Sequence, residues 1–104
     1  MLIQINTDNN IEGGARMSAY FTEILEQTLS RFNDQITRLE GHLSDVNSHK
    51  EGTDDKRCLL EARLKGLKPV VVTHQAETID FAVNGAADKL KKTLESAIGR
   101  LRNH

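Results

Sequence analysis

The feature that most limits how this chain can fold is a long amphipathic segment at residues 78–102. Its apolar residues recur at spacings of three and four, which is typical of one face of an α-helix. These residues are Ile79, Val83, Ala86, Leu90, Leu94, Ala97 and Leu101. Thr78 is expected to cap the helix, because a threonine hydroxyl accepts a hydrogen bond from an unpaired N–H group of the first turn. A helix with a single apolar stripe has to pack that stripe against another element.

One flank of this helix carries positive charge. At about 100° per residue, six residues fall together beside the apolar stripe. They are Phe81, Gly85, Lys89, Lys92, Ser96 and Arg100, and we call them the basic flank. Three cations, an aromatic ring and a glycine that admits a close partner are typical of a surface that binds phosphates. The same residues also fit an ordinary solvated face with i,i+4 ion pairs, and periodicity alone leaves both interpretations open.

Chain length and composition predict one soluble domain over residues 1–104. Hydrophobic residues make up 38% of the chain and charged residues 28%, which is typical of a globular protein with one modest core. The sequence has no apolar run of membrane-spanning length and no secretion leader, so we expect a cytoplasmic protein. A single cysteine, Cys58, excludes an internal disulfide. Because the net charge is −1, any attraction for nucleic acid has to come from a local patch.

The segments before the long helix alternate between strand and helix patterns. Strands are predicted at residues 1–8, 36–45, 56–65 and 70–74, and a helix at 15–32. Residues 47–55 are polar and lack any period, so a mobile hairpin loop is expected there. The predicted fold is therefore α+β with the order β-α-β-β-β-α. Short links between the last three strands favour an antiparallel meander, and the economical packing places both helices on one face of a four-stranded sheet.

Catalytic chemistry is not indicated by the sequence. The histidines are dispersed and lack the spacing of a metal site; they are His42, His49, His74 and His104. His74 is expected beside the core face of the fourth strand. Cys58 alternates with leucine and alanine on one strand face, which favours a core residue over a reactive thiol. Because no phosphate-binding loop or nucleophile motif is present, we expect no enzyme, no metal, no cofactor and no small-molecule substrate.

Several segments resemble the ribosome hibernation-promoting factors and ribosome-associated inhibitors, a family also called ribosomal subunit interface proteins. In chain order they read INTDNNIE, ITRLEGHLSD, DKRCLLEARLKG and VTHQAETIDFAVNGAADKLKKTL. The most specific piece is AVNGAADKL, which is similar to the start of the closing helix in that family. The resemblance covers nearly the whole chain and implies a fold akin to double-stranded-RNA-binding domains. Because the sequence ends at His104, it also implies a short form without the additional dimerising domain.

The resemblance further implies a translation inhibitor that acts on the ribosome. Members of the family bind small-subunit ribosomal RNA at the decoding region, occupy the tRNA and mRNA channel and silence idle ribosomes. Lys89 and Lys92 match positions where the family carries RNA-contacting cations, and Arg100 lies on the same flank. With Phe81 and Gly85, these residues form the RNA site that we expect.

The first predicted helix differs from the family pattern and keeps other functions open. The family usually adds lysines to the RNA-binding face there, whereas this chain has Glu23, Glu26 and Gln27. Ser96 also stands where another cation is expected. One alternative is therefore a protein-interaction or dimerisation module that kept the fold but lost the RNA surface. A small enzyme is a third possibility, but no site for it can be assembled from the sequence.

Overall fold

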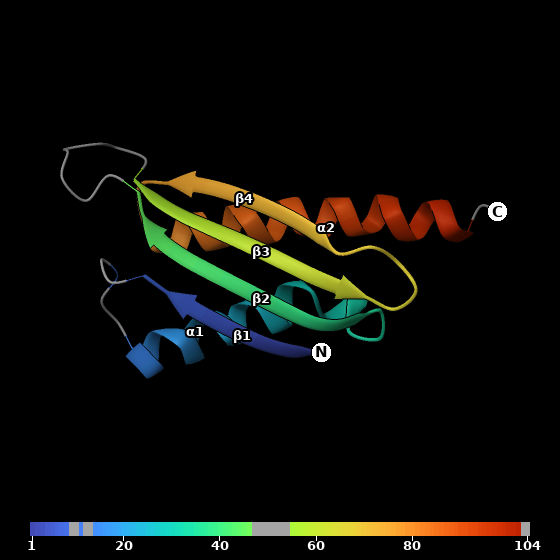
Figure 1. Cartoon of the computed structure of the whole chain (residues 1–104), viewed down its shortest axis with the longest axis horizontal. Helices are drawn as coiled ribbons and strands as arrows, with labels where there is room; N and C mark the ends of the chain where they lie inside the picture. Colours follow the sequence, from blue (N-terminus) through green and yellow to red (C-terminus); the bar gives the residue numbers. More distant parts are fainter. Residues whose placement is uncertain (9–10, 12–13, 47–54, 103–104) are drawn as a thin grey trace.

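A computed structural model describes residues 1–8, 11, 14–46 and 55–102, with the side chains of residues 100–102 left out. The elements along the chain are β1 (Leu2–Thr7), α1 (Gly14–Thr28), the short 3₁₀-helix η1 (Ser30–Phe32), β2 (Ile36–Asp45), β3 (Lys56–Leu64), β4 (Val70–Ala76) and α2 (Ile79–Arg102) (Figure 1). This order confirms the predicted α+β arrangement. The loop predicted at residues 47–55 lies, apart from Asp55, outside the described residues.

The four strands form one mixed sheet in the order β1-β2-β3-β4. β1 is parallel to β2, with Ile5 opposite Gly41, because the chain crosses over through α1 before it returns. The pairs β2–β3 and β3–β4 are antiparallel, as expected for strands joined by hairpins. One hairpin turn contains Gly66 at φ 71°, a left-handed conformation that favours glycine. Because the strand order is β1-β2-β3-β4, β1 and β4 are the two edges of the sheet.

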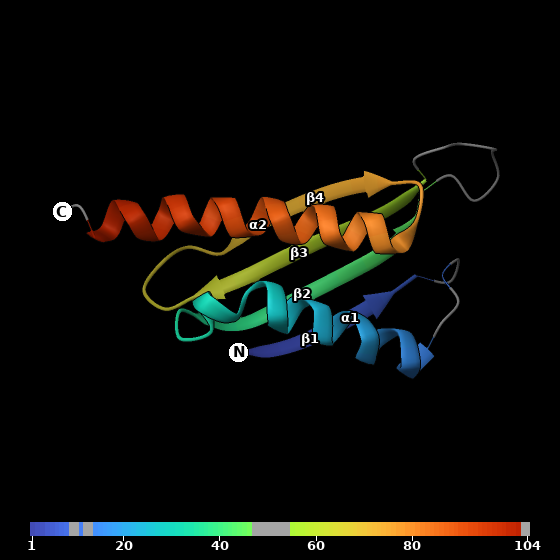
Figure 2. The ribbon, with the colours of Figure 1, turned by 180° about the vertical axis from the view of Figure 1, so that it is seen from behind.

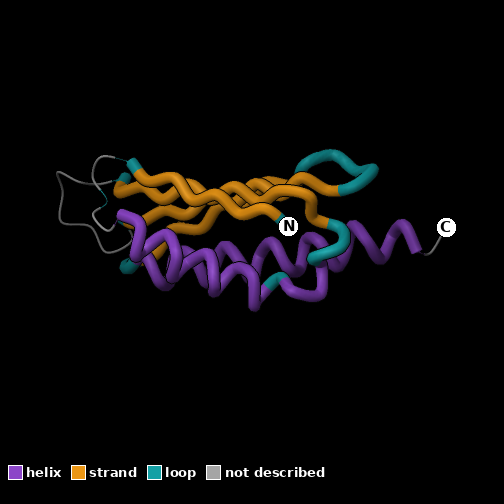
Figure 3. The backbone as a smooth tube through the Cα atoms, turned by 90° about the horizontal axis from the view of Figure 1, so that it is seen from below, coloured by secondary structure: helices purple, strands orange, loops and turns teal. Residues whose placement is uncertain are grey.

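Both helices lie on the same face of the sheet, and this confirms the predicted layering. Seen from the side, α1 and α2 form one layer and the strands a second (Figure 3). α2 runs along β3 and β4, while α1 runs along the β1 side (Figure 2). The residues of β3 that face the helices are all buried; they are Cys58, Leu60, Ala62 and Leu64. They alternate with the partly buried Leu59 and with the charged residues Arg57, Glu61 and Arg63. One face of β3 is therefore dry and the other is in contact with water.

Two details of the helices differ from the sequence prediction. The first helix ends at Thr28 instead of Phe32, because Leu29 leaves the α-helical conformation and a 3₁₀ turn follows. Phe32 is buried in this turn. The apolar spacing therefore predicted the burial of Phe32 correctly, but it did not predict where the helix ends. The last turns of α2 project beyond the strands (Figure 1). Ala97, predicted in the buried stripe, is accordingly only partly buried.

The stripe of α2 forms the centre of the core. Val83, Leu90 and Leu94 are at most 1% exposed and belong to the same cluster as Leu60 of β3. Ala82 and Ala87 are also buried, which widens the stripe beyond the predicted positions. Because Ala82 and Ala87 are small and lie at the two sides of the stripe, they let α2 lie close to the sheet.

We predict that Leu90→Ala lowers the free energy of unfolding by about 2–5 kcal/mol, because it leaves a cavity in a fully buried site. The measurement is urea unfolding followed by circular dichroism. Lys92→Ala, on the exposed side of the same helix, should change stability by less than about 0.5 kcal/mol. Equal small losses in both variants would mean that the stripe does not anchor the helix.

Candidate nucleic-acid interface

The basic flank begins at a capped helix terminus. The backbone N–H of Phe81 donates to Oγ1 of Thr78 at 3.1 Å, so Thr78 is the N-cap that the sequence predicted. This cap fixes where α2 starts. Phe81 is 62% exposed, an unusual position for a large aromatic side chain. Its ring is thus free to contact a partner.

Lys89 connects the basic flank to the edge of the sheet. Its ammonium group Nζ donates to the backbone carbonyl of Thr73 at 2.9 Å, across the space between α2 and β4. Thr73 belongs to an edge strand. The basic flank therefore lies along the free edge of β4, on the side of α2 that faces away from α1. Lys92, one turn further along α2, is exposed.

Gly85 admits a side chain of the same chain. A Cβ atom built on Gly85 would lie 2.1 Å from Cδ2 and 2.3 Å from Nε2 of His74, far inside van der Waals contact. From the sequence, we expected Gly85 to let an external partner approach closely, and in the structure a side chain of the same chain lies against it. The imidazole ring of His74, on β4, occupies that space. Only the short Glu77–Thr78 connection between β4 and α2 hinted that His74 and this helix position could meet.

The opposite flank of α2 is different in charge and contacts. Glu95 forms an ion pair of 3.1 Å with Arg31 of η1, and Lys91 is partly buried. Beyond it, α1 exposes Glu23 and Glu26. Among the described side chains of α2, the exposed lysines are Lys89 and Lys92, and both belong to the basic flank on the β4 side. The backbone of Arg100 continues the basic flank by helical spacing, but its side chain lies outside the described part of the structure.

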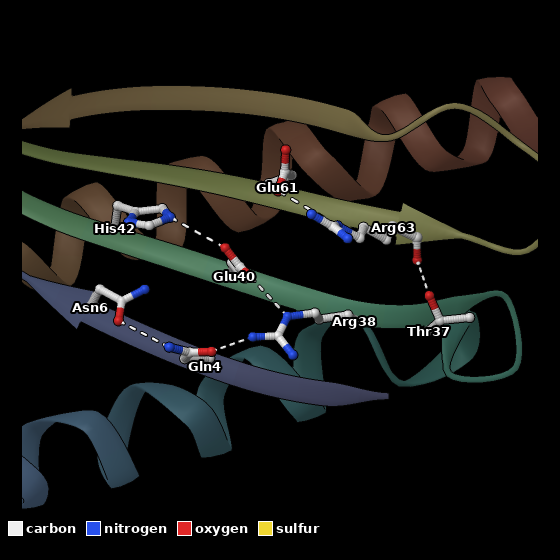
Figure 4. A network of polar contacts seen from close by, with 8 residues as sticks. All are labelled: Gln4, Asn6, Thr37, Arg38, Glu40, His42, Glu61 and Arg63. Carbon is white, nitrogen blue, oxygen red and sulfur yellow. Dashed lines mark hydrogen bonds and ion pairs between the residues drawn. The ribbon is translucent and has the colours of Figure 1, made fainter.

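The open face of the sheet carries a polar network whose charges are paired (Figure 4). Nε of Arg38 donates to Oε1 of Glu40 at 2.8 Å, and a second nitrogen of Arg38 donates to Gln4. His42 Nε2 lies 3.7 Å from the other oxygen of Glu40. The guanidinium of Arg38 holds the pKa of the Glu40 carboxyl below its ordinary value.

The remaining cation drawn in Figure 4 is also close to a carboxylate. Nε of Arg63 lies 3.9 Å from Oε1 of Glu61, and both residues belong to β3. Along β2 and β3 the charges on the open face alternate in sign, whereas across the two strands Arg38 stands opposite Arg63 and Glu40 opposite Glu61. Each of these two arginines has a carboxylate of its own strand within ion-pair distance. Such a surface offers phosphates less attraction than the α2 flank.

Within the described residues, no group of three or more His, Cys, Asp or Glu side chains is arranged to hold a metal. No helix among these residues is long and apolar enough to cross a membrane. Cys58 is fully buried, and this burial raises the pKa of its thiol to about 12. A neutral, inaccessible thiol is a packing residue, as the strand pattern predicted.

We predict that Cys58 reacts about three orders of magnitude more slowly with a thiol reagent at pH 8 in the folded protein than in urea. Folding raises the thiol pKa to about 12, so only a trace of thiolate exists at pH 8, whereas an exposed cysteine ionises near pH 8.5. The measurement is the rate of colour release from an aromatic disulfide. Similar rates with and without urea would place Cys58 outside the core.

We predict that Gly85→Ala destabilises the protein, because the new methyl group overlaps the His74 ring. In a His74→Ala background the same change should instead stabilise the fold by about 0.5–1 kcal/mol, since alanine is the better helix former. Urea unfolding of the unchanged protein, the two single variants and the double variant measures the coupling between the two positions. If Gly85→Ala changed the free energy of unfolding in the same direction in both backgrounds, this would contradict the packing of His74 against Gly85.

The fold and the one-sided basic flank describe a small α+β binding domain. Residues 3–102 match the family described as sigma 54 modulation protein / S30EA ribosomal protein, which is nearly the whole chain. The chain therefore belongs to this family, as the sequence resemblance indicated. Its members are binding factors, so the chain is not an enzyme.

Solved structures of other proteins have the same fold. The N-terminal domain of Protein Y from Thermus thermophilus superposes with a TM-score of 0.70 at 21% identity, over 92% of this chain and 98% of that one. A ribosomal subunit interface protein from Coxiella burnetii gives a TM-score of 0.69 at 17% identity, over 95% and 99%. At these identities the likeness concerns the fold. Among curated protein sequences, none matches this chain.

Proposed function

We propose that this protein associates with the ribosome, binds small-subunit ribosomal RNA near the decoding region through the basic flank of α2, and silences idle ribosomes. The observation that carries the proposal is the exposed, one-sided placement of Lys89 and Lys92 beside the β4 edge. Membership of a family described as ribosomal protein and the names of the similar structures support it. An inhibitor of this kind acts by occupying space that tRNA and mRNA need.

The geometry of the two lysines suits a phosphate backbone. They are three residues apart on α2, about 4.5 Å along the helix axis, so they can contact neighbouring phosphates. A lysine ammonium has three N–H donors. The carbonyl of Thr73 takes one of those of Lys89, which leaves two for RNA and holds the side chain in place. Contacts of this kind fix a protein on RNA by shape and charge, without reading sequence.

Phe81 adds a second type of contact at the start of the flank. Its exposed ring can stack on an unpaired base, an interaction that every base offers because each has a flat π-face. Arg38 and Arg63 on the open sheet face each lie near a carboxylate, and α1 exposes Glu23 and Glu26, so these described surfaces attract phosphates less. RNA is therefore proposed to approach from the side of α2 and β4.

We predict that Lys89→Glu and Lys92→Glu together weaken binding to purified small subunits by orders of magnitude and flatten its salt dependence. Each lost phosphate contact reduces the slope of log K against log salt by roughly 0.7–0.9. Adding Arg100→Glu should deepen both effects. Co-sedimentation over a series of salt concentrations measures them, and circular dichroism checks that the fold is kept.

The matched control is Lys91→Glu with Arg102→Glu, which reverses the same number of charges on the other flank of the same helix. This control should bind nearly as the unchanged protein does. If it loses as much affinity as the first variant, binding is general charge attraction and the flank is not a site. If the unchanged protein does not sediment with ribosomes at all, the exposed Glu23 and Glu26 of α1 favour the alternative, a protein-interaction or dimerisation module of the same fold.

A further inference from the structure

β1 is an edge strand that lacks the usual features that prevent another strand from pairing with it. Charged side chains, proline, bulges and very short length are the common forms of protection. β1 is six residues long, and its pairing with β2 keeps one register from Leu2 to Thr7. Its sequence, LIQINT, contains neither a proline nor a charged residue.

The backbone of β1 presents every second residue to the open side. The N–H of Asp8 donates to the carbonyl of Leu43 in β2 at 3.0 Å, and Thr7 stands opposite Leu43. Because the backbone groups of successive residues point to alternate sides of a strand, the residues that face outward are Ile3, Ile5 and Thr7. Within the described part of the chain, no residue forms a hydrogen bond with their N–H and C=O groups. The helices form a separate layer, so this edge of the sheet is open to a further strand (Figure 3).

The side chains of β1 indicate which kind of strand fits this edge. On the open face of the sheet Leu2 is 69% exposed, and Gln4 is exposed beside it. On the helix face Ile3 and Ile5 pack against the core but remain partly exposed. An added strand would cover the exposed remainder of both isoleucines. The edge therefore favours an uncharged strand with apolar residues at alternate positions, and β1 itself has this pattern.

We infer that β1 is a self-association surface, on which β1 of a second copy pairs in antiparallel direction about a two-fold axis. Such an axis brings the same patch of both copies together. In the register that pairs residues 1–7 with one another, Gln4 stands opposite Gln4 of the second copy and Ile3 opposite Ile5. Residues of one face then oppose residues of the same face, and each Ile3–Ile5 pair exchanges two backbone hydrogen bonds.

The charges and the position of this junction also suit a second copy. No charged side chains oppose each other along the two β1 strands, and Arg38 on the neighbouring strand is already paired with Glu40. The basic flank lies at the other edge of the sheet, so the inference does not depend on the proposed function. Because one pair of strands makes a small interface, the dimer should be reversible and form as the concentration rises.

The first test is sedimentation velocity of the full chain over a series of concentrations, in which the unchanged protein should shift from monomer to dimer. Gln4→Lys places two like charges opposite each other on the axis, so it should raise the dimer dissociation constant about tenfold or more. Gln4→Glu should have the same effect for the same reason. Because Gln4 is exposed on the open face, neither change disturbs the core.

Mixing these two variants tests the register. In an equimolar mixture the lysine of one copy faces the glutamate of the other, so the mixture should associate more tightly than either variant alone. The matched control is Val71→Lys, which adds the same charge to an exposed residue on the same face of the other edge strand, β4. This control should associate as the unchanged protein does.

The inference is overturned if the unchanged protein stays monomeric at every concentration, or if the Gln4 variants associate as tightly as it does. It is also overturned if the mixture is no tighter than its two components. Loss of association in Val71→Lys would place the contact elsewhere and would contradict the inference as well. Binding to small subunits is measured separately, so none of these results is a failure of the proposed function.

A second test uses a covalent link across the axis. In an antiparallel pair without mutual hydrogen bonds the two Cα atoms are about 4.5 Å apart, which suits a disulfide. Gln4→Cys should therefore form a disulfide-linked dimer on oxidation in air, visible on a non-reducing gel, and the buried Cys58 does not compete. Val71→Cys, on β4, should remain mostly monomeric. Equal amounts of linked dimer in both variants would mean random collision and would contradict pairing through β1.

Discussion

Burial of the α2 stripe against β3 and β4 is the interaction on which the rest of the structure depends. Leu90 and Leu94 are fully buried at its centre, and small residues at its margins let the helix approach the sheet closely. This contact fixes the rotation of α2 about its axis. Because the rotation is fixed, the flank with Lys89 and Lys92 has to lie along the edge of β4. Packing therefore determines where the positive surface is, and the charges themselves contribute little to the fold.

The three outward surfaces of the domain have different electrostatic characters. On the open face of the sheet, Arg38 is paired with Glu40 across a short contact, so its charge is already compensated. The exposed carboxylates of α1 make a second surface acidic. The β4 side of α2 combines two exposed lysines with the exposed ring of Phe81. A protein with a net charge of −1 can thus present one positive surface while the molecule as a whole is slightly negative.

The sequence was sufficient for the fold, because each element carries a clear apolar period. The alternation around Cys58 and Leu60 predicted both the strand and its buried face. The site could be predicted only in part. Helical spacing grouped Lys89 with Lys92, but spacing within one helix cannot show that the ring of His74 lies against Gly85. Such a contact joins two elements, and it depends on the distance between helix and sheet that packing sets.

The bond between Lys89 and the Thr73 carbonyl also bears on solubility. An edge strand presents unpaired N–H and C=O groups, which can pair with the edge of another molecule and begin aggregation. In β4 the lysine occupies one of these carbonyls and places a positive charge beside the edge. Two copies that met edge to edge along β4 would bring like charges together. The lysine therefore makes this edge less able to pair with the same edge of a second copy.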